Sequence, residues 1–396
     1  MKWEYKTLDQ LGKISRGRSK HRPRNDSSLF GGKYPFIQTA NVKAANFYIT
    51  EYDTTYNEKG LEQSKLWKPG TLCITIAANI ADTGILAIDA CFPDSIMGFT
   101  PYDNVSDVRF VKYCFDILQQ DCKKISQGTA QDNLSWEKLS TIKFPAPSIE
   151  IQRKVADILS AYDNLIENNQ KQIKLLEEAA QRLYKEWFVD LRFPGFETTS
   201  VVDGVPEGLE QRALGETASI LRRGISPKYD DNGKYLVISQ KCIRQSIMDI
   251  SEARRESKEY APELNLQDKD TVICSTGTGT LGRVGQIFGA YPDTTFDSHV
   301  TLVRTEEYQN FFYQAIKHQQ EFLMGMGRGS TNQQELYRGV IENLQILTPT
   351  QEILNKAESL FSTIHDKITA LNSQIVLLVE ARDRLLPKLM SGEVEV

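Results

Sequence analysis

The sequence predicts an α+β chain in which one α/β module occurs twice, the two copies being separated by an antiparallel coiled coil of two long helices. Three observations predict this fold. The two halves of the 396-residue chain correspond in order, each half contains short strand-like runs bounded by turn residues, and each half ends in a long heptad stripe. The length also exceeds that of one usual domain. We expect the modules to be related by an internal pseudo-two-fold axis.

The internal repeat pairs residues 1–196 with residues 204–396 at an offset near 202. Five segments correspond in order: 14–19 with 220–226, 34–38 with 235–239, 68–74 with 268–274, 127–131 with 328–332, and 145–147 with 347–349. Five ordered matches at a nearly constant offset indicate a duplicated module. The proline-marked breaks then predict a first module over 1–147, a helical region with its linker over 148–196, a second module over 197–349 and a second helical region over 350–396.

Each half ends in apolar residues that recur with heptad spacing, which is the seam of a coiled coil. The predicted seam residues are Val155, Leu159, Tyr162, Ile166, Ile173, Leu176 and Leu183 in the first helix, and Phe361, Ile364, Ile368, Leu371, Ile375, Leu378 and Leu385 in the second. A single stripe of this kind usually packs on the core of its own domain, but two matched stripes offer each other a partner. Asn169 and Arg382 are polar residues at seam positions, where such residues fix the register at some cost in stability.

Each module contains about 140 residues of short strand-like runs, such as 71–76 and 271–275, and fewer helical stretches, such as 108–122 and 306–322. We expect a small antiparallel sheet in each module. The two modules align in framework but differ in most side chains. That pattern is typical of a constant scaffold whose contact surface has diverged.

The composition is that of an ordinary globular protein, with 40% hydrophobic and 25% charged residues. The net charge of −5 gives no global attraction to nucleic acid. No apolar run is long enough to span a membrane, and the first residues lack the apolar stretch of a signal peptide. The six cysteines form no C-x-x-C pair and the four histidines have no metal-ligand spacing. We expect a cytoplasmic protein with reduced thiols, no metal and no membrane partner.

Four segments resemble the specificity (S) subunits of type I restriction-modification systems. They are residues 181–195, which look like the first conserved helical region and its exit, residues 384–393, which look like the family's usual C-terminus, and the Gly-Thr/Ser loops at Gly128 and Gly329. The resemblance covers the whole chain. It implies two target-recognition domains that each read one half of a split, asymmetric site in double-stranded DNA.

The resemblance also implies a chain without catalysis or cofactors of its own. Two methyltransferase subunits, and in the full complex ATP-driven restriction (translocase) subunits, would supply S-adenosylmethionine, ATP and Mg²⁺ chemistry. The residues agree, because the sequence has neither an Asn-Pro-Pro-Tyr/Phe methylation motif nor a Gly-Lys-Ser/Thr phosphate loop. The DNA sequence recognised and the length of its gap cannot be deduced from one chain.

Candidate DNA-binding residues fall into phosphate-contacting cations and base-reading polar residues. A run of positive charge is usually only a solvated loop, but this one has a counterpart in the second half. The cations are Arg16, Arg18, Lys20 and Arg22, with Arg222, Arg223 and Lys228 as the counterpart. The base-reading candidates are Gln38, Thr39, Asn41, Lys43, Gln127, Thr129, Gln131 and Asn133 in the first module, and Ser239, Gln240, Lys241, Thr276, Thr278, Thr280, Arg283, Arg328, Ser330, Thr331, Asn332 and Gln333 in the second.

Two motifs suggest other chemistry and are better explained as turns. Residues 277–282 fit G-x-G-x-x-G, with Asp297 near the place of a ribose-binding acid, but a dinucleotide site needs a helix to begin at the glycines. Residues 283–289 instead have the pattern of a second strand, which predicts a hairpin. The Pro-Asp pairs at 93–94 and 292–293 lack the acidic-x-Lys partner of a nuclease site.

The helices suggest how the two modules are spaced. About 35 helical residues at ~1.5 Å each give a rod of roughly 50 Å, which equals about 15 base pairs at ~3.4 Å and is an upper limit on the spacing of the module centres. We hypothesise that the coil is a ruler whose outer faces also dock the methyltransferases. One extra turn near residue 190 is then expected to lengthen the gap. Two alternatives stay open: a coiled-coil scaffold whose β-rich modules bind protein or RNA, and a self-sufficient modification enzyme.

Overall fold

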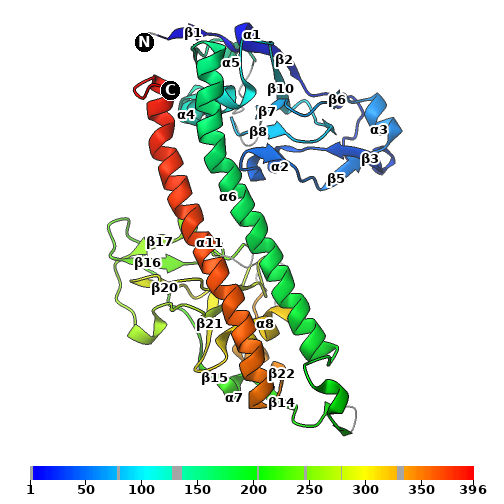
Figure 1. Ribbon diagram of the computed structural model, residues 1–396, viewed down its shortest axis with the longest axis vertical. Coiled ribbons are helices and arrows are strands. Elements are labelled where there is room, and N and C mark those ends of the chain that lie inside the picture. The colour runs from blue at the N-terminus through cyan, green and yellow to red at the C-terminus, as the bar shows by residue number, and fades with distance from the viewer. Residues whose placement is uncertain are drawn as a thin grey trace. The chain divides into compact units, whose positions relative to one another are not determined.

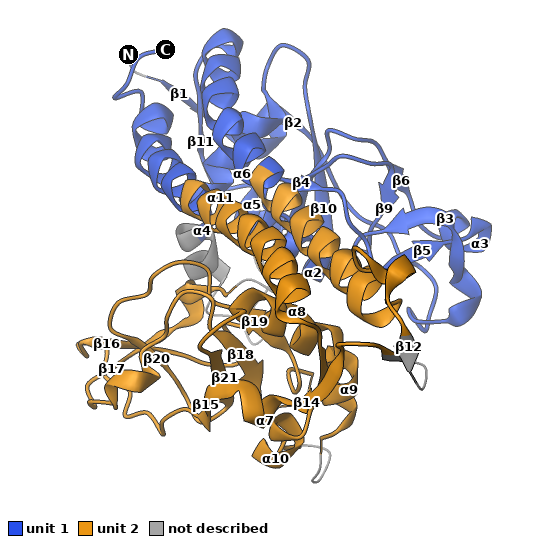
Figure 2. Ribbon diagram, turned by 60° about the horizontal axis from the view of Figure 1, so that its bottom comes forward, with its two compact units in different colours: residues 1–168, 375–396 blue, residues 169–374 orange. Residues whose placement is uncertain are grey.

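The computed structural model describes residues 3–77, 81–126, 136–202, 205–244, 248–277, 279–327 and 334–396. The chain divides into two compact units (Figure 2). Unit 1 contains residues 1–168 and 375–396, and unit 2 contains residues 169–374. Within the described residues, no helix has the length and apolarity that crossing a membrane requires.

Unit 1 is built on two sheets and a short strand pair. The larger sheet has the order β2 (Gly12–Arg16), β10 (Ile96–Pro101), β7 (Leu72–Thr75), β8 (Thr83–Leu86) and β4 (Tyr48–Ile49). The second has the order β5 (Thr54–Tyr56), β3 (Phe30–Phe36), β9 (Ala90–Cys91) and β6 (Leu66–Trp67), and β1 (Glu4–Lys6) pairs with β11 (Phe144–Ala146). Every residue of β7 and β8 is buried, so their continuous apolar runs, and not an alternating pattern, form the centre of the sheet.

The helices of unit 1 outside the coil are α1 (Leu8–Leu11), the single turn η1 (Ser27–Leu29), α2 (Thr39–Ala44), α3 (Glu58–Glu62), α4 (Val108–Ser126) and α5 (Trp136–Leu139). The helix α4 places Phe110, Tyr113 and Phe115 in the same buried cluster as Leu72 of the sheet. Ordinary amphipathic packing of one helix face therefore closes the core of the first module.

Unit 2 repeats the plan with fewer strands in its two main sheets. One sheet has the order β15 (Ala218–Arg223), β21 (Val300–Thr305), β18 (Thr271–Cys274) and β19 (Val284–Gln286), and the other has the order β17 (Arg254–Glu256), β16 (Tyr235–Ile238) and β20 (Thr294–Phe296). Two further pairs join β14 (Glu210–Ala213) to β22 (Gln345–Thr348) and β12 (Val201–Val202) to β13 (Val205–Pro206). The helices are α7 (Leu214–Thr217), α8 (Gln309–His318), α9 (Gln320–Gly325) and α10 (Arg338–Glu342), with single turns η3 (Phe196–Thr198), η4 (Ile250–Glu252) and η5 (Pro262–Leu264).

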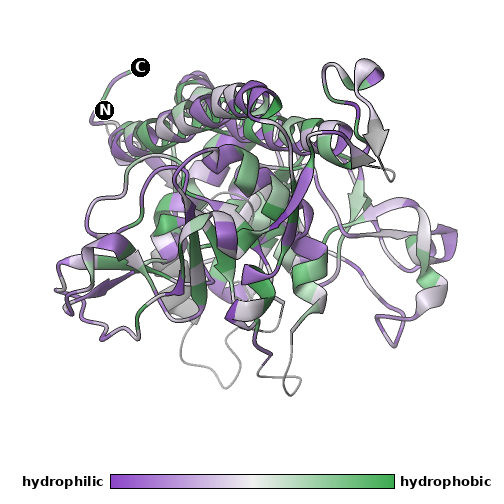
Figure 3. Ribbon diagram, turned by 90° about the horizontal axis from the view of Figure 1, so that it is seen from below, coloured by the Kyte–Doolittle hydropathy of each residue, from purple (hydrophilic) through white to green (hydrophobic). Residues whose placement is uncertain are grey.

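The expected single antiparallel sheet per module was wrong, because each module divides its strands between two main sheets. The pairs β3–β9 and β4–β8 in unit 1 and β16–β20 in unit 2 are parallel. Strands that are distant along the chain meet in these pairs, and local alternation patterns do not predict such meetings. The apolar residues gather in the strands of each module, whereas its peripheral loops are hydrophilic (Figure 3).

The same backbone hydrogen bonds occur in both modules, which relates their residues directly. Gly17 N–H donates to Ile96 O (2.8 Å), as Gly224 N–H donates to Val300 O (3.1 Å). A Cβ on Gly17 would lie 2.2 Å from Pro93 O, and one on Gly224 would lie 2.1 Å from Phe296 O. Both positions therefore admit only glycine without a shift of the backbone. The duplication thus includes the close approach of two backbone segments at this glycine.

Two long helices, α6 (Ile149–Tyr184) of 36 residues and α11 (Gln351–Ser391) of 41 residues (Figure 1), each contribute residues to both units. Each begins just after a proline break, where Gln152 N–H donates to Ser148 O and Leu354 N–H donates to Thr350 O. The helix α6 ends in a π-helical turn over Lys185–Val189, after which Leu191 takes the left-handed conformation (φ 58°).

In each unit, a segment of α6 runs antiparallel to a segment of α11. In unit 1, the buried Asp163 pairs with Arg382 (2.6 Å), and in unit 2 Asn169 Nδ2 donates to Gln374 Oε1 (3.2 Å). The two polar seam residues Asn169 and Arg382 thus find partners on the facing helix. None of the fourteen predicted seam residues is exposed.

The helices also pack on the modules. Val155 and Leu159 of α6 share the core of unit 1 with Leu389 of α11 and the first module. Ala357 and Phe361 of α11 occupy the matching place in the core of unit 2. The heptad stripe is therefore both a coiled-coil seam and part of a module core, since it packs on the partner helix and on the adjacent module.

Candidate nucleic-acid interface

The predicted basic cluster of unit 1 contains exposed cations, one of which is hydrogen-bonded to the backbone of its own segment. Arg16, Arg18 and Lys20 are exposed, at the end of β2 and in the segment that follows it. Arg22 is also exposed, but its guanidinium donates to Ser19 O (2.7 Å) and His21 O (2.8 Å). The first three side chains remain the better candidates for phosphate contacts.

The counterpart cations of unit 2 are held differently. The Arg223 guanidinium pairs with Glu335 and donates to Leu336 O (2.8 Å), so it ties β15 to the segment before α10. Arg222 is exposed and pairs with Glu263 (3.4 Å), and Lys228 is exposed.

The backbone bonds limit how far positive charge recurs between the modules. Arg18 N–H donates to Phe92 O as Ile225 N–H donates to Phe296 O. Because Gly17 corresponds to Gly224, Arg16 corresponds to Arg223 and Arg18 to Ile225. Positive charge therefore recurs at one of these two positions, and in the second module the Arg223 guanidinium there is engaged within the protein.

The first base-reading cluster of unit 1 lies at the start of α2. Gln38 N–H donates to Asn41 Oδ1 (2.8 Å) and Asn41 Nδ2 donates to Asp53 (2.8 Å), so Asn41 caps the helix and orients a loop. Thr39 is half-buried, whereas the side chains of Gln38 and Lys43 are exposed. These last two side chains are the ones open to a ligand.

In unit 2, the corresponding candidates lie around the end of β18. Thr276 Oγ1 donates to Gln240 Oε1 (3.1 Å) and lies 2.7 Å from His299 Nδ1, and Thr280 Oγ1 donates to Thr276 O (2.9 Å). His299 was not among the residues predicted from the sequence. It directly precedes β21, and only the strand pairing brings it next to Thr276.

The remaining candidates of unit 2 are placed as follows. Ser239 is half-buried, with its Oγ accepting from Lys241 N–H (3.2 Å), Lys241 is exposed, and Arg283 is half-buried at the start of β19. The candidates outside the described residues are Gln127, Thr129, Gln131, Asn133, Thr278, Arg328, Ser330, Thr331, Asn332 and Gln333.

The glycine-rich segment 277–282 forms a hairpin, as predicted. The strands β18 and β19 pair antiparallel on either side of it, from Thr271 opposite Gln286 to Ile273 opposite Val284. Gly277, Gly279 and Gly282 have φ of +98°, +77° and +75°, which is the turn conformation that favours glycine. A strand follows these glycines where a dinucleotide site needs a helix.

The two Pro-Asp pairs serve the fold. Asp94 accepts a bidentate pair of hydrogen bonds from Arg24 (2.7 and 2.9 Å), and Asp293 lies in a turn (φ 50°) and pairs with Lys234 (3.5 Å). Over the described part of the chain, no three His, Cys, Asp or Glu side chains converge as a metal-holding group.

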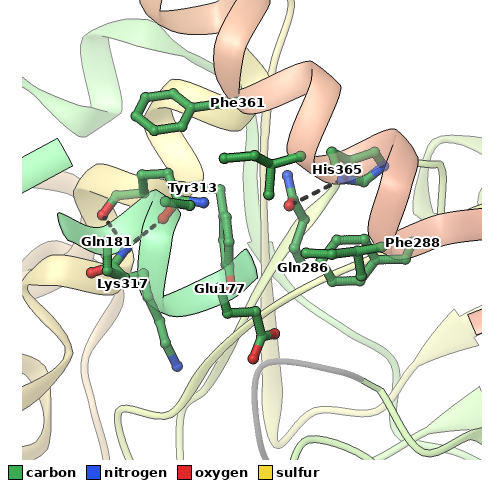
Figure 4. A pocket seen from close by; sticks show the side chains of 12 residues that line it. Glu177, Gln181, Gln286, Phe288, Tyr313, Lys317, Phe361 and His365 are labelled. Atoms are coloured by element: carbon green, nitrogen blue, oxygen red, sulfur yellow. Dashed lines mark hydrogen bonds between the residues drawn. The ribbon is translucent and has the colours of Figure 1, made fainter. Parts of the chain in front are cut away.

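A small cavity of about 20 Å³ lies inside unit 2, between α6, α11 and the module (Figure 4). That volume holds roughly one water molecule. On its wall, the buried His365 ring stacks on Phe288 (centroids 4.7 Å apart) and bonds to Asp268 (2.9 Å) and Gln286 (3.2 Å). Burial lowers the pKa of Lys317, whose Nζ donates to Val284 O (3.1 Å). The cavity walls join helices to sheet, and the space is too small for an organic ligand.

A family model described as "Type I restriction modification DNA specificity domain" matches residues 1–178 and 206–381. The chain belongs to this family. The type I restriction enzyme MjaIX specificity subunit of Methanocaldococcus jannaschii is 26% identical over 416 residues, covering 100% of this chain and 94% of the relative. The HindI specificity subunit of Haemophilus influenzae is 23% identical over 334 residues, covering 66% of this chain and 71% of the relative.

Among solved structures, the type I restriction-modification S subunit from M. genitalium matches with a TM-score of 0.58 and 17% identity, covering 98% of this chain and 96% of the other. At that identity the likeness shows the fold alone. The predicted family and fold class are confirmed, and with the family the predicted role in DNA sequence specificity. The predicted domain limits and the individual DNA-binding residues stay predictions.

Proposed function

We propose that this family member reads a split, asymmetric site in double-stranded DNA, one half with each module, and carries out no chemistry itself. One observation supports this proposal most: backbone hydrogen bonds of the frame recur in both modules, whereas side chains at equivalent positions differ, as Arg18 and Ile225 do. A binding scaffold requires a constant frame with a variable surface, because base-edge contacts specify sequence while the scaffold only positions them.

The two long helices set the distance between the half-sites in this proposal. Both helices pass from one unit into the other, and polar pairs such as Asp163–Arg382 and Asn169–Gln374 fix how their seams align. A register slip would separate these pairs and leave the buried Asp163 without its partner cation. The proposal therefore predicts an unread gap of one length.

Exposed apolar side chains on the helices are the proposed docking sites of two methyltransferase subunits. Ile158 on α6 (38% exposed) and Leu360 on α11 (44%) occupy equivalent positions of the repeat, and so do Leu175 (63%) and Leu377 (64%). Single exposed apolar residues are common on proteins, but recurrence at the repeat offset is not explained by chance exposure. Unit 1 carries Ile158 and Leu377, and unit 2 carries Leu360 and Leu175. Each unit thus offers the same pair to one partner subunit.

The docking proposal is tested by counting partner subunits. Ile158→Ser with Leu377→Ser is expected to reduce the complex from two methyltransferase subunits to one, as measured by mass photometry. Leu360→Ser with Leu175→Ser is the matched pair and is expected to do the same. A stoichiometry of two in both double variants would contradict these docking sites.

The cofactors belong to the partners in this proposal. S-adenosylmethionine, ATP and Mg²⁺ would be bound by the methyltransferase and restriction subunits. The isolated chain is expected to give no heat of binding with S-adenosylmethionine or Mg-ATP by calorimetry. Binding of either at micromolar affinity would contradict the assignment.

The central experiment is co-expression of the chain with its cognate methyltransferase subunit, followed by methylation-sensitive sequencing of the host DNA. A single motif made of two short, different sequences separated by a fixed gap is the expected result. A complex that forms but neither methylates nor retains DNA would favour the alternative, a coiled-coil scaffold whose modules bind protein or RNA. Crosslinking of RNA to the modules in such cells would identify that alternative directly.

A further inference from the structure

We propose that His299 is a base-reading residue of the second module and that it accepts a hydrogen bond from the exocyclic amino group of adenine or cytosine in the major groove. The inference rests on the proposed function and deepens it. Thr276 and Gln240 are the positioning residues, because Thr276 contacts the imidazole ring and Gln240 contacts Thr276.

His299 is an exposed side chain on a firmly held backbone. Its N–H donates to the carboxylate of the buried Asp297 (2.9 Å), and its carbonyl accepts from Ser275 N–H at the end of β18 (2.8 Å). Both backbone groups are thus satisfied by the frame of the module. The position of the ring is fixed by the sheet, while the ring itself lies at the surface.

The protonation of the ring follows from counting hydrogen atoms. The Thr276 hydroxyl has one proton, and it donates that proton to Gln240 Oε1 (3.1 Å). In that arrangement, the contact of 2.7 Å between Thr276 Oγ1 and His299 Nδ1 is made by a proton on Nδ1, and this tautomer is part of the proposal. In the neutral ring, Nε2 is left as an acceptor. The major-groove groups that donate to an acceptor are adenine N6 and cytosine N4.

The chain of three side chains is supported from behind by the hairpin. Gly277 has φ +98°, and a Cβ there would lie 2.5 Å from Thr280 Oγ1 and 2.8 Å from Gln240 Nε2. Only glycine lets the loop approach the Gln240 amide this closely. Thr280 Oγ1 in turn donates to Thr276 O (2.9 Å). The Gln240 amide and the Thr276 hydroxyl are therefore held side by side behind the ring.

The first module has the same frame without this device. Ile76 N–H donates to Ser95 O (3.0 Å) just as Ser275 N–H donates to His299 O, so Ser95 is the equivalent of His299 and Ala77 that of Thr276. A methyl group cannot orient a ring or a hydroxyl. Among the described residues, the imidazole acceptor therefore belongs to the second module, as expected of a residue that makes the two half-sites different.

The test uses the complex of this chain with its cognate methyltransferase subunit and the motif that its methylation defines. His299→Asn keeps a hydrogen-bonding group beside Thr276 but removes the atom at the place of Nε2. Discrimination is expected to fall by about tenfold at one base pair of one half-site, with the other half-site and the gap unchanged. Thr276→Val should weaken discrimination at the same base pair by a smaller factor. His318→Asn, the same change at another exposed histidine of unit 2, should leave the motif unchanged.

Base analogues identify the group that is read. Replacing the adenine or cytosine at that base pair with purine or 2-pyrimidinone, which lack the amino group, should weaken binding of the unaltered complex by about tenfold and have no further effect on the His299→Asn complex. Equal loss at every base pair of the motif, sensitivity to 7-deazapurine instead of amino removal, or an unchanged motif in His299→Asn would each overturn the inference while leaving the proposed function intact. Absence of any split motif with the unaltered chain would overturn both.

Discussion

Lengthening both long helices by one heptad tests the ruler. The insertion points are between residues 168 and 169 in α6 and between residues 374 and 375 in α11, which are the chain boundaries of the two units. They face one another, since Asn169 bonds to Gln374 beside both points. Residue 190, the insertion point expected from the sequence, is unsuitable because α6 ends at Tyr184 and its π-turn at Val189. Residues added at 190 would lengthen a connection and not the paired helices.

The expected change in the gap follows from helix geometry. Seven residues at ~1.5 Å add about 10 Å to each helix, which corresponds to about 3 base pairs. Seven residues also keep the seam on one face, since a straight helix drifts by only about 20° per heptad. DNA turns once per ~10.5 base pairs, so 3 extra pairs rotate the second half-site by about 100°. The one-heptad chain should therefore methylate a longer-gapped motif, but slowly.

Three heptads reduce the rotational mismatch from about 100° to about 50° and make the prediction sharper. Twenty-one residues add about 31 Å with a drift of about 60°. The nearest whole number of base pairs is about 9, and these fall short of a full turn by about 50°. Methylation should recover on a motif whose gap is about 9 pairs longer. Sequencing of methylated host DNA reads the gap directly, and seven residues inserted after Gly195, outside both helices, are the control. An unchanged gap in the one-heptad and three-heptad chains would refute the ruler.

Three further predictions concern the stability of the modules. Arg304→Met leaves the Asp270 carboxylate buried without the two hydrogen bonds of 2.6 Å that it accepts from Arg304. We expect the free energy of unfolding in urea to fall by about 3–5 kcal/mol, and by less at acid pH, because protonation of Asp270 removes the unpaired charge. A destabilisation that grows on acidification would contradict this prediction. Gly17→Ala and Gly224→Ala should each cost about 1–3 kcal/mol, because both Cβ atoms meet backbone oxygens, and a large difference between them would argue against equivalent frames. Burial raises the pKa of the Cys274 thiol to about 12, and Cys73, Cys91, Cys114 and Cys242 are also buried; mass spectrometry after native alkylation should find these five thiols unmodified, and rapid labelling of any of them would contradict their burial.

The sequence predicted the repeat and the helices because those features are local or periodic. The offset near 202 aligns Val155 with Ala357 and Leu159 with Phe361, and the structure places these pairs in equivalent cores. The hairpin at 277–282 was also predictable, since strand patterns flank its glycines. Each of these features depends on residues that lie near one another along the chain or recur at a fixed spacing.

The details of the site depend on contacts between distant residues, and these were not predictable. From the sequence, Arg223 is indistinguishable from a free cation. In the structure, β15 lies beside the segment before α10, where Arg223 pairs with Glu335. His299 has no local pattern that marks it, because its partner Thr276 lies in another strand connection. The parallel pairs β3–β9 and β16–β20 were missed for the same reason.

The order in which the units close during synthesis follows from how the chain is divided between them. Unit 2 is one continuous stretch, residues 169–374, and can form its core as soon as that stretch has left the ribosome. Unit 1 needs Leu389 and Met390 of α11 to cover Leu159 and the first module. At ~5–20 residues per second, the intervening stretch takes about 10–40 s to translate. The module made first is thus completed last, and during that interval its apolar surface is open to chaperones, to the nascent α6 or to another chain.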